Sequence, residues 1–269
     1  MSTTCMFIKL GGSILTDKTQ PEALDTATLH TVATTIAATL REQPELRLLI
    51  GHGGGSFGHY WAQQYGTQHG VHDALGWQGV ARVADAMGRL NRIVVAALLE
   101  AGVSAVGVQP LASASAEGGT LRELALPVIE RLLDVGIVPV VYGDVVLDRL
   151  QGAAIISTEQ LFAYLAPQIQ PRRIVLVGEA GVYTADPRHD PTAVRIAQIS
   201  AANIETVLEQ TGASHGTDVT GGMAAKVAQM WSLVQSVPGL DVLLIGVEPT
   251  ALRRALYGEA IDAGTLIRR

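Results

Sequence analysis

A glycine run between a predicted strand and a predicted helix constrains this chain more than any other feature. Residues 46–50 form an apolar run of strand length, three consecutive glycines follow at 53–55, and the next residues can start a helix. Glycine lets a backbone approach an anion without a Cβ in the way, and the first N–H groups of a helix point at that anion with the positive end of the helix dipole. The stretch therefore predicts a phosphate-binding turn, with His59 on the first helical turn. The alternative is a tight turn that uses glycine without binding a ligand.

Composition sets the class of protein. The chain has 269 residues, of which 48% are hydrophobic and 16% charged, so it can bury the core of a large compact domain. A formal net charge of −6 leaves no basic stripe for nucleic acid. The single cysteine, Cys5, excludes an internal disulfide framework and suits a reducing compartment. No uncharged apolar run reaches about 18 residues. We therefore expect a cytoplasmic protein that binds neither nucleic acid nor a membrane.

Strand patterns alternate with helix patterns along the chain. This alternation predicts an α/β fold with a mainly parallel sheet that is covered by helices on both faces. The expected strands are 6–10, 46–50, 103–108, 137–142, 173–177, 240–245 and 264–267; the expected helices are 25–41, 80–101, 121–135, 159–166, 201–209 and 250–257, with one more that carries Lys226 in its first turns. Residues 145–157 should form a hairpin, 110–120 a loop, and 61–77 a mobile segment near the site.

The lysines mark glycine-rich segments. The chain has 16 arginines but only three lysines, Lys9, Lys18 and Lys226. A chain that chooses arginine so often should keep lysine where a compact ammonium group on a flexible stem is needed. The glycine turns at 11–12, 53–55 and 221–222 could line one edge of a parallel sheet, where ligands bind beyond the carboxyl ends of the strands.

These residue types suit phosphoryl transfer. That reaction needs cations at the phosphate oxygens, backbone N–H donors and in-line positioning, and little covalent help from the protein. The three lysines supply cations and the glycine turns supply donors. Asp144, at the end of a buried strand, could orient two ammonium groups, or it could simply cap the turn that follows.

A dinucleotide-binding motif is also present in form. Gly53, Gly55 and Gly58 match G-x-G-x-x-G, and Asp73 follows at the expected distance. However, Asp73 does not end a recognisable second strand, and the motif follows the second strand instead of opening the fold. A dehydrogenase would also leave the lysines without a role.

Four motifs together resemble a known family. They are Lys9-Leu-Gly-Gly-Ser13, His52-Gly-Gly-Gly-Ser-Phe-Gly-His59, Gly143-Asp144-Val145-Val146 and Asp218-Val-Thr-Gly-Gly-Met-Ala-Ala-Lys226. Over nearly the whole chain they look like the amino acid kinase superfamily, and within it like the isopentenyl phosphate kinase branch. The resemblance implies one domain, a three-layer αβα sandwich, with an acceptor-binding half at about 1–157 and a nucleotide-binding half at about 158–269. It also implies a homodimer that uses ATP and Mg²⁺ to convert isopentenyl phosphate to isopentenyl diphosphate in an alternative mevalonate pathway.

The same resemblance implies roles for the charged residues. Lys9 and Lys226 would contact the phosphates of ATP, and Lys18 would stabilise the transferring phosphoryl group. Asp144 would hold the lysines in place. The implied nucleotide-binding residues are Lys9, Gly11, Gly12, Ser13, Gly55, Glu159, Gly181, Gly221, Gly222 and Lys226. No residue is expected to ligate a metal directly.

On the acceptor side, His59 would bind the acceptor phosphate, with Gly54 and Gly143 lining that site. An imidazole can donate a hydrogen bond to a phosphate, and no carboxylate base is needed because the acceptor oxygen is already ionised. Lys9, Lys18, His59, Asp144 and Lys226 thus form the implied catalytic set.

Two segments depart from the family pattern, both in the nucleotide half. The chain has Ser157-Thr158-Glu159 where the family usually has Ser-Gly-Asp, so that Glu159 would replace the aspartate. It has Val177-Gly178-Glu179-Ala180-Gly181 where the family has Thr-Asp-x-Asp-Gly, and so lacks both aspartates. Two further readings stay open: a related kinase of the fosfomycin or nucleoside monophosphate type, and a catalytically silent nucleotide sensor.

Overall fold

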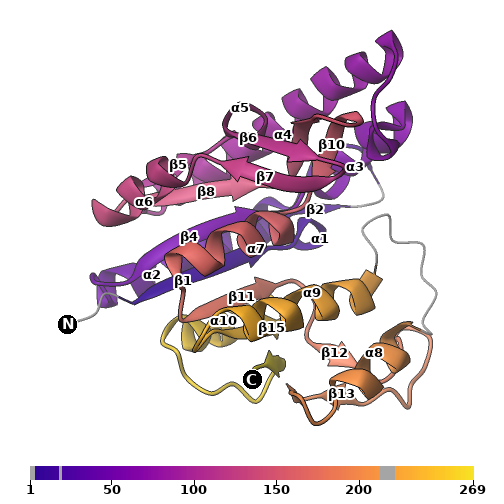
Figure 1. Cartoon of the computed structure of the whole chain (residues 1–269). Coiled ribbons are helices and arrows are strands. Elements are labelled where there is room, and N and C mark those ends of the chain that lie inside the picture. Colours follow the sequence, from indigo (N-terminus) through magenta and orange to yellow (C-terminus); the bar gives the residue numbers. More distant parts are fainter. Residues whose placement is uncertain (1–3, 18–19, 213–221) are drawn as a thin grey trace.

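The structure is a computed structural model that describes residues 4–17, 20–212 and 222–269. Within these residues an eight-stranded sheet forms the centre, in the order β14-β16-β15-β11-β1-β4-β8-β5 (Figure 1). Its strands are β1 (Cys5–Leu10), β4 (Arg47–His52), β5 (Ala105–Gly107), β8 (Val138–Tyr142), β11 (Arg173–Val177), β14 (Gln198–Ile199), β15 (Asp241–Ile245) and β16 (Thr265–Ile267). All neighbouring pairs are parallel except β15 and β16. The mainly parallel sheet predicted from the sequence is therefore confirmed.

Helices cover both faces of this sheet (Figure 1). Side chains alternate between the faces of a strand, so Met6, Ile8 and Leu10 pack in one apolar core while Cys5 and Phe7 pack in the other. The first core contains residues of α2 (Thr26–Glu42), α4 (Ala74–Glu100) and α10 (Pro249–Leu256), and the second those of α6 (Leu126–Asp134), α7 (Thr158–Ile169), α8 (Ile204–Gly212) and α9 (Gly222–Ser236). This confirms the three-layer sandwich.

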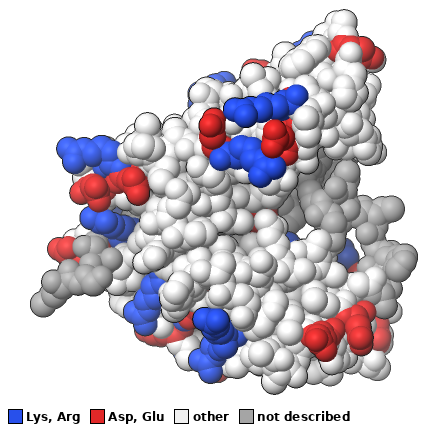
Figure 2. All heavy atoms as spheres, viewed as in Figure 1, with Lys and Arg blue, Asp and Glu red and all other residues white. Residues whose placement is uncertain are grey.

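Two observations concern possible membrane and nucleic-acid contacts. Although α4 spans 27 residues, none of the described helices combines the length and apolar character that crossing a bilayer requires. Figure 2 shows arginine and lysine side chains lying next to acidic ones on the face it presents.

Residues 110–124 form structure that the sequence does not predict. The expected loop contains α5 (Pro110–Ser113) and β6 (Ala114–Glu117), and the expected helix at 121–135 begins with β7 (Thr120–Leu124) and becomes α6 only afterwards. The turn between β6 and β7 is held by Asp148, whose carboxylate accepts the N–H groups of Gly118 at 3.0 Å and Gly119 at 2.7 Å. Local periodicity cannot detect a turn fixed by a carboxylate so distant in sequence.

The remaining elements are short. A second sheet has the order β10-β9-β6-β7, with β9 (Asp144–Asp148) and β10 (Gly152–Ile156) forming the predicted hairpin. Residues 61–77 are mostly helical, because α3 (Gly55–Tyr65) continues into them, a 3₁₀ turn η1 (Thr67–His69) follows, and α4 begins at Ala74. The other elements are α1 (Gly12–Leu15) and the two-stranded pairs β2 (Thr16–Asp17) with β3 (Ala23–Leu24) and β12 (Val182–Tyr183) with β13 (Arg195–Ile196).

Five central strands end in register at one edge of the sheet. Leu10 pairs with His52 and Val177, His52 pairs with Tyr142, and Val177 pairs with Ile245. The residues that follow these strand ends are all glycines: Gly11, Gly53, Gly143, Gly178 and Gly246. The carboxyl edge is therefore a row of half-buried backbone without side chains, as ligand binding beyond the strand ends requires.

Two of these turns touch backbone to backbone. We call residues 11–12 the first glycine turn and residues 53–55 the second glycine turn. A Cβ on Gly12 would lie 2.2 Å from the nitrogen of Gly55, and a Cβ on Gly53 would lie 2.9 Å from the nitrogen of Gly12. Gly55 also has a φ of +48°, which side-chain-bearing residues rarely adopt. The contact therefore requires glycine on both sides.

Replacing Gly12 with alanine should break this contact. We expect Gly12→Ala to lower the free energy of unfolding by more than about 3 kcal/mol, because backbone would have to move. Gly88→Ala is the matched control, since a Cβ there meets only the end of Arg92 at 3.8 Å and should stabilise α4 by up to about 1 kcal/mol. Urea unfolding measures both. Wild-type stability in Gly12→Ala would contradict the close contact.

Candidate active site

A cavity opens at the carboxyl edge of the sheet. Both glycine turns line it, together with the start of α3, the segment after β8, and the first turns of α7 and α9. A smaller neighbouring cavity shares Lys9, Gly11, Ser13, Glu159, Glu179 and Lys226 with it and continues along the end of β11. The charged residues Lys9, Glu159, Glu179 and Lys226 therefore lie between the two cavities and line both of them.

The structure brings most of the predicted site residues to this cavity. Those that line it are Lys9, Gly11, Gly12, Ser13, Gly54, Gly55, His59, Gly143, Asp144, Glu159, Gly222 and Lys226. Gly181 is not among them: it is buried, and a Cβ there would meet Thr265 Oγ1 at 2.8 Å. Lys18 and Gly221 lie outside the described residues.

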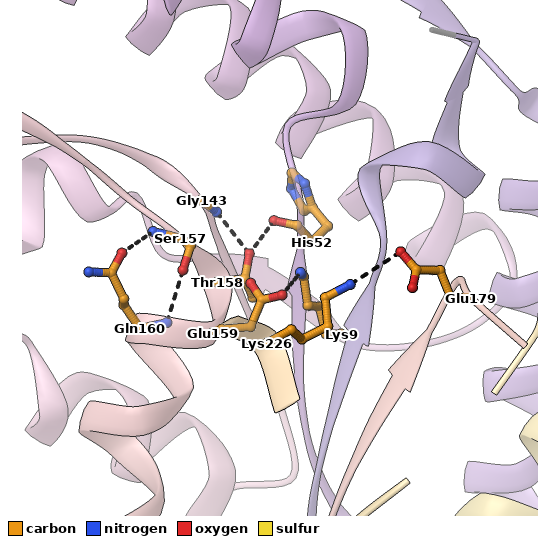
Figure 3. A network of polar contacts seen from close by, with 9 residues as sticks. All are labelled: Lys9, His52, Gly143, Ser157, Thr158, Glu159, Gln160, Glu179 and Lys226. Carbon is orange, nitrogen blue, oxygen red and sulfur yellow. Dashed lines mark hydrogen bonds and ion pairs between the residues drawn. The ribbon is translucent and has the colours of Figure 1, made fainter. Parts of the chain in front are cut away.

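Lys9 is held by Glu159 (Figure 3). The lysine lies on β1, and the glutamate lies on the first turn of α7, which a capping box between Ser157 and Gln160 fixes at its start. Burial works against charge on both groups and lowers the pKa of Lys9. Burial alone would raise the pKa of Glu159, but the charge and hydrogen bond of Lys9 outweigh it and keep that pKa below its usual value. Glu159 is thus an ionised partner that fixes one ammonium group.

Lys226 has a looser partner. Its Nζ atom lies 3.4 Å from Oε1 of Glu179, on the loop after β11, and the Glu179 side chain is 53% exposed. This is the loop in which the family's two aspartates are missing. Glu179 stands between those two positions, so the loop keeps a carboxylate at the site. The family pattern did not predict this carboxylate, because the pattern leaves the position of Glu179 unspecified.

Asp144 makes no ion pair with Lys9 or Lys226 in the structure. Its Oδ1 atom accepts the N–H of Val145 at 2.9 Å, and its Oδ2 atom has no partner among the described residues. Burial raises the pKa of Asp144 to about 8. The two described lysines pair with Glu159 and Glu179 instead. The role of Asp144 toward Lys18 stays a prediction, because Lys18 lies outside the described residues.

An apolar wall borders the cavity beside His59. His59 comes from α3 and is exposed at the cavity, near Gly54 and Gly143 in the lining. Met87 of α4 packs against α3, since a Cβ on Gly58 would lie 2.7 Å from its sulfur. The apolar lining residues on this side are Ala62, Val83, Met87 and Ile155, whereas the side chain of Ile156 is fully buried in the second core and Ala225 belongs to α9 beside Lys226. The cavity therefore combines polar groups suited to phosphate with a wall suited to a hydrocarbon.

A buried histidine supports the second glycine turn. The imidazole of His52 lies 3.1 Å from the carbonyl of Gly53 through Nδ1 and 3.1 Å from the amide nitrogen of Asn91 through Nε2, and it stacks on Tyr142. Because a neutral ring can donate at one nitrogen and accept at the other, both contacts are satisfied without charge. Burial lowers the pKa of His52 to about 4.

Asp73, part of the apparent dinucleotide motif, has a structural role. Its carboxylate accepts the N–H of Gly76 at 2.7 Å and caps the start of α4. It does not line the cavity.

The buried state of His52 predicts a pH dependence of stability. The pKa falls from its ordinary 6.5 to about 4 in the folded state, so the unfolded chain binds a proton that the folded chain does not bind in this window. The stabilising contribution is present above pH 6.5 and is lost as the pH falls toward 4, by about 3 kcal/mol. His52→Gln should lack this part of the dependence, and the opposite contribution of Asp144 cancels in the comparison.

Urea unfolding of both proteins across this pH window measures the difference. His30→Gln, at an exposed position of α2, serves as the control and should keep the wild-type profile. Identical pH profiles for His52→Gln and the wild type would contradict a buried neutral histidine.

Known proteins resemble the chain over its whole length. A model of the amino acid kinase family matches residues 4–244. The isopentenyl phosphate kinase of Haloferax volcanii is 38% identical over 264 residues, 97% of each chain. That of Methanothermobacter thermautotrophicus is 34% identical over 264 residues, 95% of this chain and 96% of the relative. A solved isopentenyl phosphate kinase, 31% identical, superposes with a TM-score of 0.82 over 98% of this chain and 99% of that one.

Proposed function

The chain belongs to the amino acid kinase family, and on this premise we propose that it transfers the terminal phosphoryl group of ATP to isopentenyl phosphate. The products would be ADP and isopentenyl diphosphate. The observation that carries the proposal is the composition of the cavity, where two lysines and two glycine turns lie beside an apolar wall. The lysines suit phosphates and the wall suits a prenyl chain.

The apolar wall of the cavity favours one class of acceptor over another. A nucleoside monophosphate brings a base and a sugar, which need convergent hydrogen-bonding groups, whereas a prenyl tail needs apolar surface. The apolar side chains of this wall are Ala62, Val83, Met87 and Ile155 of β10, none of which offers a strong hydrogen-bonding group. This supports isopentenyl phosphate over a nucleotide acceptor.

The two described lysines would take different parts in the transfer. Lys9 is fixed by a buried carboxylate and would meet the ATP phosphates at a constant position. Lys226 is paired with a half-exposed carboxylate at 3.4 Å, a contact that contributes little in water and can be exchanged for phosphate oxygens. His59 would donate to the acceptor phosphate. The role proposed for Lys18 rests on the resemblance alone.

Mg²⁺ is proposed to accompany ATP. Within the described residues, no group of three or more histidine, cysteine, aspartate or glutamate side chains could enclose a metal ion. The site therefore fits an ion held chiefly by the phosphates, with Glu179 as a neighbouring carboxylate. When bound, Mg²⁺ supplies neutralisation of charge on the phosphate oxygens.

The arrangement of the chain is part of the same proposal. We assign acceptor binding to residues 1–157 and nucleotide binding to residues 158–269, since the apolar wall comes from the former and Lys226 from the latter. We also propose a cytoplasmic location, which the single cysteine suits, and a homodimer, which the family resemblance implies.

His59 provides the test. We expect His59→Ala to raise the KM for isopentenyl phosphate roughly tenfold or more, because one donor to a charged group is lost, and to leave the KM for ATP within about twofold. Coupled detection of ADP measures both constants. His30→Ala, at an exposed position of α2, is the control and should match the wild type. An unchanged acceptor KM in His59→Ala would reject the proposed acceptor site.

A further inference from the structure

Thr158 is a buried threonine at the junction of the two halves of the site. It lies on the first turn of α7, between the capping residue Ser157 and the lysine partner Glu159, and only 1% of its surface is exposed. The motif that the chain resembles has glycine at this position, so the sequence predicts no role for a side chain here.

The hydroxyl of Thr158 joins two strand ends (Figure 3). Its Oγ1 atom donates to the carbonyl of His52 at 2.7 Å and accepts the N–H of Gly143 at 3.1 Å. The N–H of Gly143 also lies 3.0 Å from the carbonyl of His52. The three groups therefore close a small ring of hydrogen bonds with no buried group left unpaired.

This ring sits where the β4–β8 ladder stops. The last residues paired in register are His52 and Tyr142, and the chains then separate. One continues into the second glycine turn and His59, and the other into Gly143 and Asp144. The Thr158 hydroxyl thus adds one cross-link beyond the ladder, between the two segments that line the acceptor side of the cavity.

The methyl group of Thr158 has a separate role. A Cβ on Gly51 would lie 2.4 Å from Thr158 Cγ2, so the methyl group fills the space above this glycine in β4. Packing by the methyl group and bonding by the hydroxyl can therefore be removed one at a time.

We propose that the Thr158 hydroxyl is a positioning group for the acceptor phosphate, an inference that rests on the proposed function. It does not touch the acceptor. It fixes the second glycine turn relative to Gly143, so that the donors of both segments meet one phosphate. Without it, acceptor binding weakens while the ATP contacts of Lys9 and Lys226 remain.

The test separates hydroxyl from methyl. Thr158→Val keeps the shape and removes the hydroxyl, and Thr158→Ser keeps the hydroxyl and removes the methyl group. We expect the KM for isopentenyl phosphate to rise roughly five- to twentyfold in the valine variant and to stay within about twofold in the serine variant. The KM for ATP should change less than about twofold in both. If the valine variant does not fold, the comparison of Thr158→Ser with Thr158→Ala isolates the same hydroxyl.

Thr39→Val is the matched control, because this buried threonine also donates to a backbone carbonyl, that of Thr35 at 2.9 Å, within α2. It should lose stability without a change in either KM.

An unchanged acceptor KM in Thr158→Val, an equal rise in the serine variant, or an equal rise in both KM values would overturn the inference. If the wild type does not phosphorylate isopentenyl phosphate, the proposed function fails instead, and calorimetric binding of that compound to the same variants decides the role of Thr158.

Discussion

The direct contact between two glycine turns is the constraint on which the rest of this structure depends. The first turn follows β1 and the second follows β4, and no side chain separates them, because a Cβ on Gly12 would lie 2.2 Å from the backbone of Gly55. The N–H of Gly53 donates to the carbonyl of Leu10 at 3.0 Å and ties the second turn to the first strand. Two neighbouring strands can therefore open the same cavity with bare backbone, which is what a phosphate requires.

The charged groups gather at this edge because their elements begin or end there. Lys9 is the penultimate residue of β1, Glu159 is the second residue of α7, and Lys226 lies near the start of α9. The first turn of α7 is central to this arrangement, since Thr158 faces the acceptor side and Glu159 faces Lys9. One helix start thus links both substrates of the proposed reaction, and the two lysines differ in how firmly they are held.

Local signals in the sequence predicted the sheet and the location of the site. Apolar periodicity identifies strands and helices, and the glycines after the strands mark the binding edge. The features that the sequence did not predict depend on contacts between residues distant in the chain. The turn at 118–119 relies on Asp148, and the pairing of Lys9 with Glu159 joins residues 150 positions apart. Glu179 stands at an unspecified position of the family loop and Thr158 stands where the family has glycine, so the pattern predicts a role for neither.

The proposed phosphoryl transfer is tested most directly by following the phosphorus atoms of the donor and the acceptor. Phosphorus-31 NMR of the protein with ATP, Mg²⁺ and isopentenyl phosphate follows donor and acceptor together. We expect the acceptor monophosphate signal to be replaced by the two coupled signals of a diphosphate while ADP forms in equal amount. Formation of ADP with inorganic phosphate and an unchanged acceptor signal would contradict phosphoryl transfer to isopentenyl phosphate.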